Sequence, residues 1–156
     1  MVAQKETTLV TIGTVVKEGE QRSIELEPEY RAAIEGLDEF SHLLVVWWAD
    51  KFEEYRLAVD MVMELPYAPG VKAGLFATRS PVRPNPICIN TARLVAVDVG
   101  AGRIDLDEID AYAGTKVLDI KPYYGCIDRV KEYTQPAWVP EDWGEWYVPI
   151  PEMDYG

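Results

Sequence analysis

The stretch Ser41-His42-Leu43-Leu44-Val45-Val46-Trp47-Trp48-Ala49 is a continuous apolar run rich in β-branched and aromatic residues. Its length and composition favour a central β-strand that is buried on both faces. Successive strand residues face opposite sides of a sheet. We therefore expect one of Trp47 and Trp48 in the core and the other at a contact with a second subunit. His42, at the start of the run, is expected to be a partly buried histidine with its hydrogen bonds satisfied.

Shorter strand candidates lie on both sides of this run. They are β-branched or alternate polar with apolar residues, between charged, glycine or proline residues. The candidates are residues 8–16, 22–27, 60–65, 74–77, 87–97, 103–107 and 116–121. A glycine-rich turn at residues 100–102 predicts that the strands on either side of it form a hairpin. Residues 28–37 are expected to form a short helix, and residues 51–57 a helix or a loop. The pattern predicts a mainly β fold, an antiparallel barrel or sandwich with one or two short helices.

Length and composition indicate one globular domain. The chain has 156 residues, of which 48% are apolar and 27% are charged. We expect a core over residues 8–130 and an irregular arm over residues 131–156, which docks its aromatic side chains on the barrel or on a second subunit. The sequence shows no run of about 18 apolar residues and no signal peptide, so we expect a cytoplasmic protein without a membrane partner.

Charge and cysteine content narrow the functional classes. The net charge of −12 opposes the approach of nucleic acid, although a local basic patch can still bind RNA. Two cysteines and one histidine are too few for a Cys/His zinc site, and no metal is expected. Cys88 is expected to be a small buried apolar group, with a reactive thiol as the alternative. A disulfide between Cys88 and Cys126 stays open.

The segment Thr78-Arg79-Ser80-Pro81-Val82-Arg83-Pro84-Asn85-Pro86 has the composition of a ligand-binding loop. Its prolines fix φ and exclude a helix. A stiff loop of this kind loses little entropy when it binds a ligand. Arg79 and Arg83 are suited to bidentate pairing with a carboxylate. The alternative is a proline-rich connection whose arginines pair with some of the 27 acidic residues of the chain.

Three blocks of the sequence resemble the TrmO family, also called the TsaA-like family. They are GLDEFSHL at residues 36–43, GLFATRSPVRPNPI at residues 74–87 and GTKVLDIKPY at residues 114–123, in the order of the family. The resemblance implies a small antiparallel β-barrel that binds S-adenosylmethionine, usually as a homodimer. It also implies transfer of a methyl group to N6 of threonylcarbamoyl-adenosine at position 37 of tRNA.

The same resemblance implies a set of site residues. Arg79 and Ile89 fall where the family binds the cofactor, and Asp50-Lys51 falls where many members have His-Lys. The loop before the third block is expected to close this site, through Ala111, Tyr112, Ala113, Gly114 and Thr115. The further motif or substrate candidates are Thr78, Ser80, Arg83, Pro84, Asn85, Asp119 and Lys121. No general base is identified, and Arg79 is expected to bind the carboxylate of the cofactor.

Some positions at this site differ from the family pattern. The departures are Asp50 for His, Cys88 for Gly, Ala113 for Asp or His, and Lys116 for Pro. The sequence therefore indicates the cofactor more firmly than the methyl acceptor. The alternatives are a methyltransferase of this fold that acts on another RNA or a small molecule, and a non-enzymatic S-adenosylmethionine-binding module. A basic surface around Arg79, Arg83 and Lys121 would favour RNA, and an acidic surface would favour a small substrate.

Overall fold

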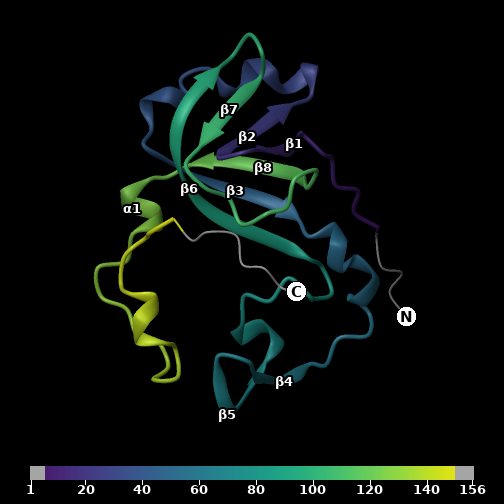
Figure 1. Cartoon of the computed structure of the whole chain (residues 1–156), viewed down its shortest axis with the longest axis vertical. Coiled ribbons are helices and arrows are strands. Elements are labelled where there is room, and N and C mark those ends of the chain that lie inside the picture. Colours follow the sequence, from purple (N-terminus) through teal and green to yellow (C-terminus); the bar gives the residue numbers. More distant parts are fainter. Residues whose placement is uncertain (1–5, 150–156) are drawn as a thin grey trace.

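The central apolar run forms strand β3 (His42–Trp48) of a closed, antiparallel, six-stranded β-barrel (Figure 1). The structure is a computed structural model that describes residues 6–149. The other barrel strands are β1 (Gly13–Glu18), β2 (Gln21–Leu26), β6 (Ile87–Asp98), β7 (Arg103–Leu106) and β8 (Lys116–Pro122). Their order around the barrel is β1-β2-β7-β6-β3-β8. The prediction of a mainly β, antiparallel fold is confirmed, and the barrel rather than the sandwich is present.

The inward residues of β3 show why this strand is central. β3 pairs with β6 on one side and β8 on the other, and Leu43, Val45 and Trp47 are buried in the barrel core. The alternate residues are only half-buried, so the prediction of burial on both faces is wrong. A closed barrel has one interior, and the opposite face of each strand lies outside it. Trp48 lies on that outer face, where its Nε1 donates to Glu53 Oε2 at 3.2 Å.

Two strand predictions need correction. The first strand begins at Gly13 rather than residue 8, and it extends to Glu18. Residues 75–77 form a 3₁₀ helix, whereas the strand expected at 74–77 lies earlier, as β5 (Ala68–Gly74). β5 pairs only with β4 (Val62–Leu65), outside the barrel. The proline and glycine of β5 are tolerated because an edge strand does not need every backbone N–H.

Short helices lie between the strands and after the last strand, β8. The 3₁₀ helices are Pro28–Ile34, Leu37–Glu39, Asp50–Tyr55, Leu75–Ala77 and Glu141–Trp143, and the single α-helical turn is α1 (Gly125–Asp128). The predicted helix at 28–37 is therefore a 3₁₀ helix that ends before Gly36, which has φ of 79°. None of the helices in residues 6–149 is long and apolar enough to cross a membrane.

The described part of the C-terminal arm, residues 131–149, packs aromatic side chains against other parts of its own chain. The ring centroids of Tyr67 and Trp143 lie 5.0 Å apart, and those of Tyr67 and Trp138 lie 6.2 Å apart. Further along, Tyr147 packs edge-on against His42, with ring centroids 5.4 Å apart. The last residues of the predicted arm, 150–156, lie outside the described residues. The arm is drawn in yellow-green and yellow along one side of the molecule in Figure 1.

Candidate functional site

A cavity of about 460 Å³ lies at one end of the barrel, where segments distant in sequence meet. It is bounded by the end of β3 and the helix after it, the Arg79 loop (residues 78–86), the start of β6, and the segment before β8. Its lining comprises Trp47, Ala49, Asp50, Lys51, Phe52, Arg79, Pro81, Arg83, Ile87, Cys88, Ile89, Asn90, Asp110, Tyr112, Thr115 and Trp143. This volume lies within the range of small-molecule sites.

The first half of the Arg79 loop is held by hydrogen bonds within the loop. Thr78 is buried, and its hydroxyl donates to the Leu75 carbonyl at 2.7 Å. The backbone N–H of Ser80 donates to Thr78 Oγ1 at 3.3 Å. Arg83 Nη1 donates to the carbonyls of Thr78 (3.2 Å) and Ser80 (2.9 Å). Thr78, Ser80 and Arg83 therefore fix the shape of the loop, and much of the donor capacity of Arg83 is used there.

The second half of the loop is anchored from outside. Arg56 Nε donates to the Pro84 carbonyl at 2.8 Å, and its Nη2 lies 3.5 Å from Asn85 Oδ1. The buried Pro86 accepts a hydrogen bond from the Ala49 N–H at 2.8 Å. Pro84 and Asn85 do not line the cavity, and they connect the loop to Arg56, which directly follows the helix Asp50–Tyr55.

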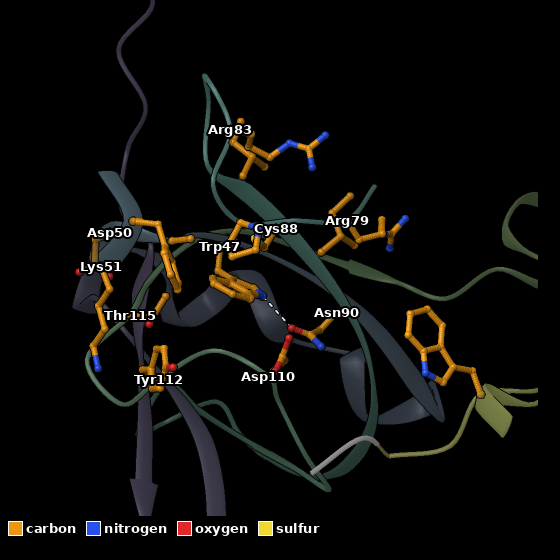
Figure 2. A pocket seen from close by; sticks show the side chains of 16 residues that line it. Trp47, Asp50, Lys51, Arg79, Arg83, Cys88, Asn90, Asp110, Tyr112 and Thr115 are labelled. Atoms are coloured by element: carbon orange, nitrogen blue, oxygen red, sulfur yellow. Dashed lines mark hydrogen bonds between the residues drawn. The ribbon is translucent and has the colours of Figure 1, made fainter. Parts of the chain in front are cut away.

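Arg79 is the cation that this scaffold leaves available. Its side chain is exposed, and within residues 6–149 its guanidinium makes no hydrogen bond or ion pair. The alternative in which Arg79 and Arg83 pair with acidic side chains is therefore not what the structure shows: Arg83 donates to loop carbonyls and Arg79 faces the cavity margin. Figure 2 shows both arginines on one side of Trp47, with Lys51 and Tyr112 on the other. A guanidinium in this position is suited to a carboxylate ligand.

Trp47 and Asn90 form a polar contact at the inner end of the cavity. Trp47 Nε1 donates to Asn90 Oδ1 at 2.7 Å, drawn as a dashed line in Figure 2. An indole N–H can only donate, so the amide oxygen of Asn90 must face it. The amide nitrogen then faces away from Trp47, and Asn90 lines the cavity. Its two N–H donors are positioned to bind a hydroxyl or a carbonyl of a ligand.

On the opposite side of the cavity, Lys51 contacts Tyr112 and so connects the helix after β3 with the segment before β8. Lys51 Nζ lies 3.7 Å from the centroid of the Tyr112 ring, which is a close cation–π contact. The segment that carries Tyr112 is itself fixed to β1, because Gly114 N–H donates to the Val15 carbonyl at 2.8 Å and Val15 N–H donates to the Thr115 carbonyl at 2.9 Å. This wall of the cavity is therefore ordered by the barrel.

Cys88 lines the cavity as a half-buried, free thiol. Burial raises the pKa of this thiol to about 11, although the nearby cations Arg83 and Arg79 oppose the shift. The thiol is therefore protonated near neutral pH and is a poor nucleophile. This favours the small apolar reading of Cys88 over the reactive one. Cys126 is also free, so the structure contains no disulfide between the two.

The structure brings some of the predicted site residues to this cavity and leaves others elsewhere. The predicted residues that line it are Asp50, Lys51, Arg79, Arg83, Ile89, Tyr112 and Thr115. Those that do not line it are Thr78, Ser80, Pro84, Asn85, Ala111, Ala113, Gly114, Asp119 and Lys121. Ala111 is fully buried in the barrel core, whereas Ala113 and Gly114 are exposed in a turn. The ligand-binding role of every one of these residues stays a prediction.

Asp119 and Lys121 are placed away from the cavity by the register of β8. They lie opposite Val46 and Leu44, two half-buried positions that precede Trp47 in β3 and alternate with its buried residues. Lys121 Nζ is 2.7 Å from Asp119 Oδ2, and this carboxylate raises the pKa of Lys121. Lys121 therefore adds no free cation beside Arg79.

Besides Cys88, eight residues that line the cavity were not assigned to the site from the sequence: Trp47, Ala49, Phe52, Pro81, Ile87, Asn90, Asp110 and Trp143. Asn90 could have been recognised from its position, because it is a polar residue on the inward face of β6. Cys88, Asn90 and Ala92 occupy alternate positions on this face, opposite Trp47, Val45 and Leu43 respectively. A polar residue at an inward strand position indicates either a buried hydrogen bond or a site. Trp143 carried no such signal, because its position depends on how the arm folds back.

Comparison with known families decides the assignment. Residues 5–129 match the profile of the tRNA-methyltransferase O N-terminal domain. The chain belongs to this family. The family resemblance noted in the sequence is therefore confirmed, and residues 130–156 lie beyond the part that matches the family.

The chain is similar to named family relatives of different lengths. A probable S-adenosyl-L-methionine-binding protein of Halobacterium salinarum is 37% identical over 100 residues, which cover 64% of this chain and 73% of the relative. The human tRNA (adenine(37)-N6)-methyltransferase is 40% identical over 109 residues, which cover 70% of this chain but 23% of that enzyme. A crystal structure of TrmO from Pseudomonas aeruginosa superposes with a TM-score of 0.66 at 27% identity, covering 88% of this chain and 63% of the other.

Proposed function

We propose that this chain is an S-adenosylmethionine-dependent methyltransferase that acts on N6 of an adenosine in tRNA, with threonylcarbamoyl-adenosine at position 37 as its acceptor. The observation that carries the proposal is the cavity of about 460 Å³, with the free guanidinium of Arg79 at its margin and the fixed amide of Asn90 inside. The names of relatives support both parts, since some are named as probable S-adenosyl-L-methionine-binding proteins and others as tRNA (adenine(37)-N6)-methyltransferases.

The donor groups of the cavity fit the chemistry of the cofactor. S-adenosylmethionine has a carboxylate, which Arg79 is placed to bind, and ribose hydroxyls, which the Asn90 amide can bind. Its adenine needs an apolar, partly aromatic surface, and Trp47, Phe52 and Ile89 provide one. The acidic side chain of Asp50 at the cavity can interact favourably with the positive sulfonium or ammonium.

Catalysis at such a site is mainly a matter of position. When bound, the cofactor supplies an electrophilic methyl group, and the acceptor nitrogen must be held in line with it. The ordered walls serve this purpose, because the Arg79 loop is held by Thr78 and Arg56, and the opposite wall is held by Lys51 and Tyr112. The Cys88 thiol stays protonated and takes no part as a nucleophile.

The local charge at the cavity is more favourable to an RNA acceptor than the net charge of the whole chain is. Three cationic side chains, Lys51, Arg79 and Arg83, line it with two acidic ones, Asp50 and Asp110, although the chain carries a net charge of −12. A locally cationic site is what an acidic protein needs to bind RNA. The acidic remainder also favours a second candidate, an S-adenosylmethionine-binding module without an RNA substrate. Three archaeal relatives are named as probable S-adenosyl-L-methionine-binding proteins.

The oligomeric state and location belong to the same proposal. We propose a cytoplasmic homodimer, without a metal or a membrane partner. Large apolar side chains are exposed beside the cavity and the β4–β5 hairpin, among them Leu57, Met61, Val62 and Phe76. Light scattering at micromolar concentration should give the mass of a dimer, and the mass of a monomer would contradict this part of the proposal.

The proposal is tested with methyl-labelled S-adenosylmethionine and two tRNA preparations, one with and one without the threonylcarbamoyl group. We expect label only in the modified tRNA. Equal transfer to both would leave the methyltransferase but remove the threonylcarbamoyl requirement. No transfer to either tRNA, with cofactor binding intact, would favour the binding module.

A further inference from the structure

The C-terminal arm places an aromatic side chain at the mouth of the candidate site. Trp143 ends the 3₁₀ helix Glu141–Trp143, and it lines the cavity although it lies 14 residues beyond the end of the family match at residue 129. Gly144, with φ of 74°, ends that helix. The Trp143 side chain is 54% exposed, so it is available to a ligand.

Contacts on both sides of Trp143 hold the arm in this place. Tyr67, from the turn between β4 and β5, packs against both Trp138 and Trp143. Beyond Trp143, the hydroxyl of Tyr147 lies 3.3 Å from Asp107 Oδ2, to which it can donate. Burial and the Asp107 carboxylate raise the pKa of Tyr147 to about 12, so its hydroxyl remains a donor near neutral pH. The indole ring of Trp143 is thus positioned before any ligand arrives.

Trp143 also lines a second, adjoining hollow, here called the arm groove. The arm groove has a volume of about 620 Å³ and lies between the β4–β5 hairpin, the Arg79 loop and the arm. Its apolar side chains include Met63, Leu65, Tyr67, Trp138, Val139 and Trp143. Arg79, Pro81 and Trp143 line both the cavity and the arm groove, so the two spaces adjoin.

We propose that the arm groove binds an unstacked base of single-stranded RNA, next to the acceptor nucleotide, by stacking on Trp143. An exposed aromatic ring beside a cation is the means by which proteins bind bases without reading their edges. The lining of the groove is apolar, with Arg79 as its charged group, so it suits the flat face of a base rather than a charged small molecule. This inference rests on the proposed function in one respect, namely that the methyl acceptor is a nucleotide of RNA.

The matched variants come from the arm itself. Trp143→Ala removes the stacking surface, and Trp143→Phe keeps an aromatic face. Trp146→Ala is the control, because Trp146 lies in the same arm, is 78% exposed, and does not line either space. Far-UV circular dichroism establishes that each variant keeps the barrel.

The experiment measures binding of a fluorescein-labelled RNA hairpin by anisotropy, beside a blunt duplex of the same stem. Loss of one stacked base should weaken hairpin binding by about fivefold to a hundredfold in Trp143→Ala. Trp143→Phe should keep most of the affinity, Trp146→Ala should match wild type, and duplex binding should not change. Equal affinities of wild type and Trp143→Ala for the hairpin, or no hairpin binding by wild type, would overturn the groove proposal.

The two proposals fail separately. If labelled methyl groups reach tRNA but Trp143→Ala leaves the KM for tRNA unchanged, the arm groove is wrong and the proposed function stands. If Trp143→Ala weakens hairpin binding but no methyl group is transferred, the groove stands and the methyltransferase proposal fails. Quenching of tryptophan fluorescence by an apolar peptide in wild type but not in Trp143→Ala, without any effect of the variants on RNA binding, would overturn the RNA proposal and assign the groove to a protein partner.

Discussion

Replacing Trp47 by phenylalanine tests the contact that organises the inner end of the cavity. The Trp47 side chain is buried, with 7% of its surface exposed, and its Nε1 donates to Asn90 Oδ1 at 2.7 Å. Phenylalanine keeps an aromatic ring in the core but removes the donor. The Asn90 oxygen then has no donor from this side and can rotate out of its fixed orientation.

The cost follows from two terms. Losing the partner of a partly buried amide oxygen costs about 1–3 kcal/mol. The smaller ring leaves roughly 40 Å³ unfilled, which adds about 1 kcal/mol if the barrel does not relax. We therefore expect Trp47→Phe to lower the free energy of unfolding by about 2–4 kcal/mol. Affinity for S-adenosylmethionine should fall about tenfold, because one oriented hydrogen bond to the ligand is lost.

The assay is urea unfolding followed by far-UV circular dichroism, with Trp48→Phe as the matched control. Trp48 is the next residue of β3 but faces outward, and its hydrogen bond to Glu53 is longer, at 3.2 Å, and exposed. Its replacement should cost less than about 1 kcal/mol. Equal losses of stability in the two variants would refute the assignment of Trp47 as the inner, hydrogen-bonded ring.

Two further predictions concern the barrel and the thiol. Gly13→Ala should lower the free energy of unfolding by about 1–3 kcal/mol, because a Cβ there would lie 2.5 Å from the Glu25 carbonyl oxygen. The control Gly125→Ala places its Cβ in open space and should be nearly neutral. Equal urea midpoints for the two variants would contradict this prediction. In a Cys126→Ser background, alkylation of Cys88 by iodoacetamide should stay slow at pH 8 and rise only towards pH 11, because burial raises the pKa of this thiol to about 11. Because the pKa of the Cys88 thiol is higher in the folded state than in the unfolded state, the folded protein holds this proton more tightly. The contribution of Cys88 to the free energy of unfolding is therefore fully present below the unfolded-state pKa and is lost as the pH rises towards 11. Rapid alkylation at pH 8 would show that Cys88 is not buried as described.

The strands of the barrel were predictable because their patterns are local. Residues 22–27 and 116–121 alternate polar with apolar residues, and both form strands within one residue of the predicted bounds. Pro69 and Gly70 lie inside β5, in a segment between the predicted strands 60–65 and 74–77. The pattern did not show that β5 would be an edge strand outside the barrel, where proline is tolerated.

The candidate site was only partly predictable, because it depends on which strand ends meet. The resemblance to the TrmO family indicated Arg79, Lys51 and Tyr112, which do line one cavity. Asn90 could have been recognised as a polar residue on the inward side of β6. Trp143 could not, since no local pattern shows that residues 131–149 fold back over Tyr67.

The most direct test of the account is a calorimetric titration of S-adenosylmethionine into wild type, Arg79→Ala, Asn90→Ala and the control Arg129→Ala. Arg129 is exposed and does not line the cavity. We predict saturable binding by wild type and Arg129→Ala, and binding at least tenfold weaker for Arg79→Ala, as loss of a charge-assisted hydrogen bond requires. Asn90→Ala should also bind more weakly. Absence of saturable heat with wild type, or one affinity for all four proteins, would contradict the assignment of this cavity to the cofactor.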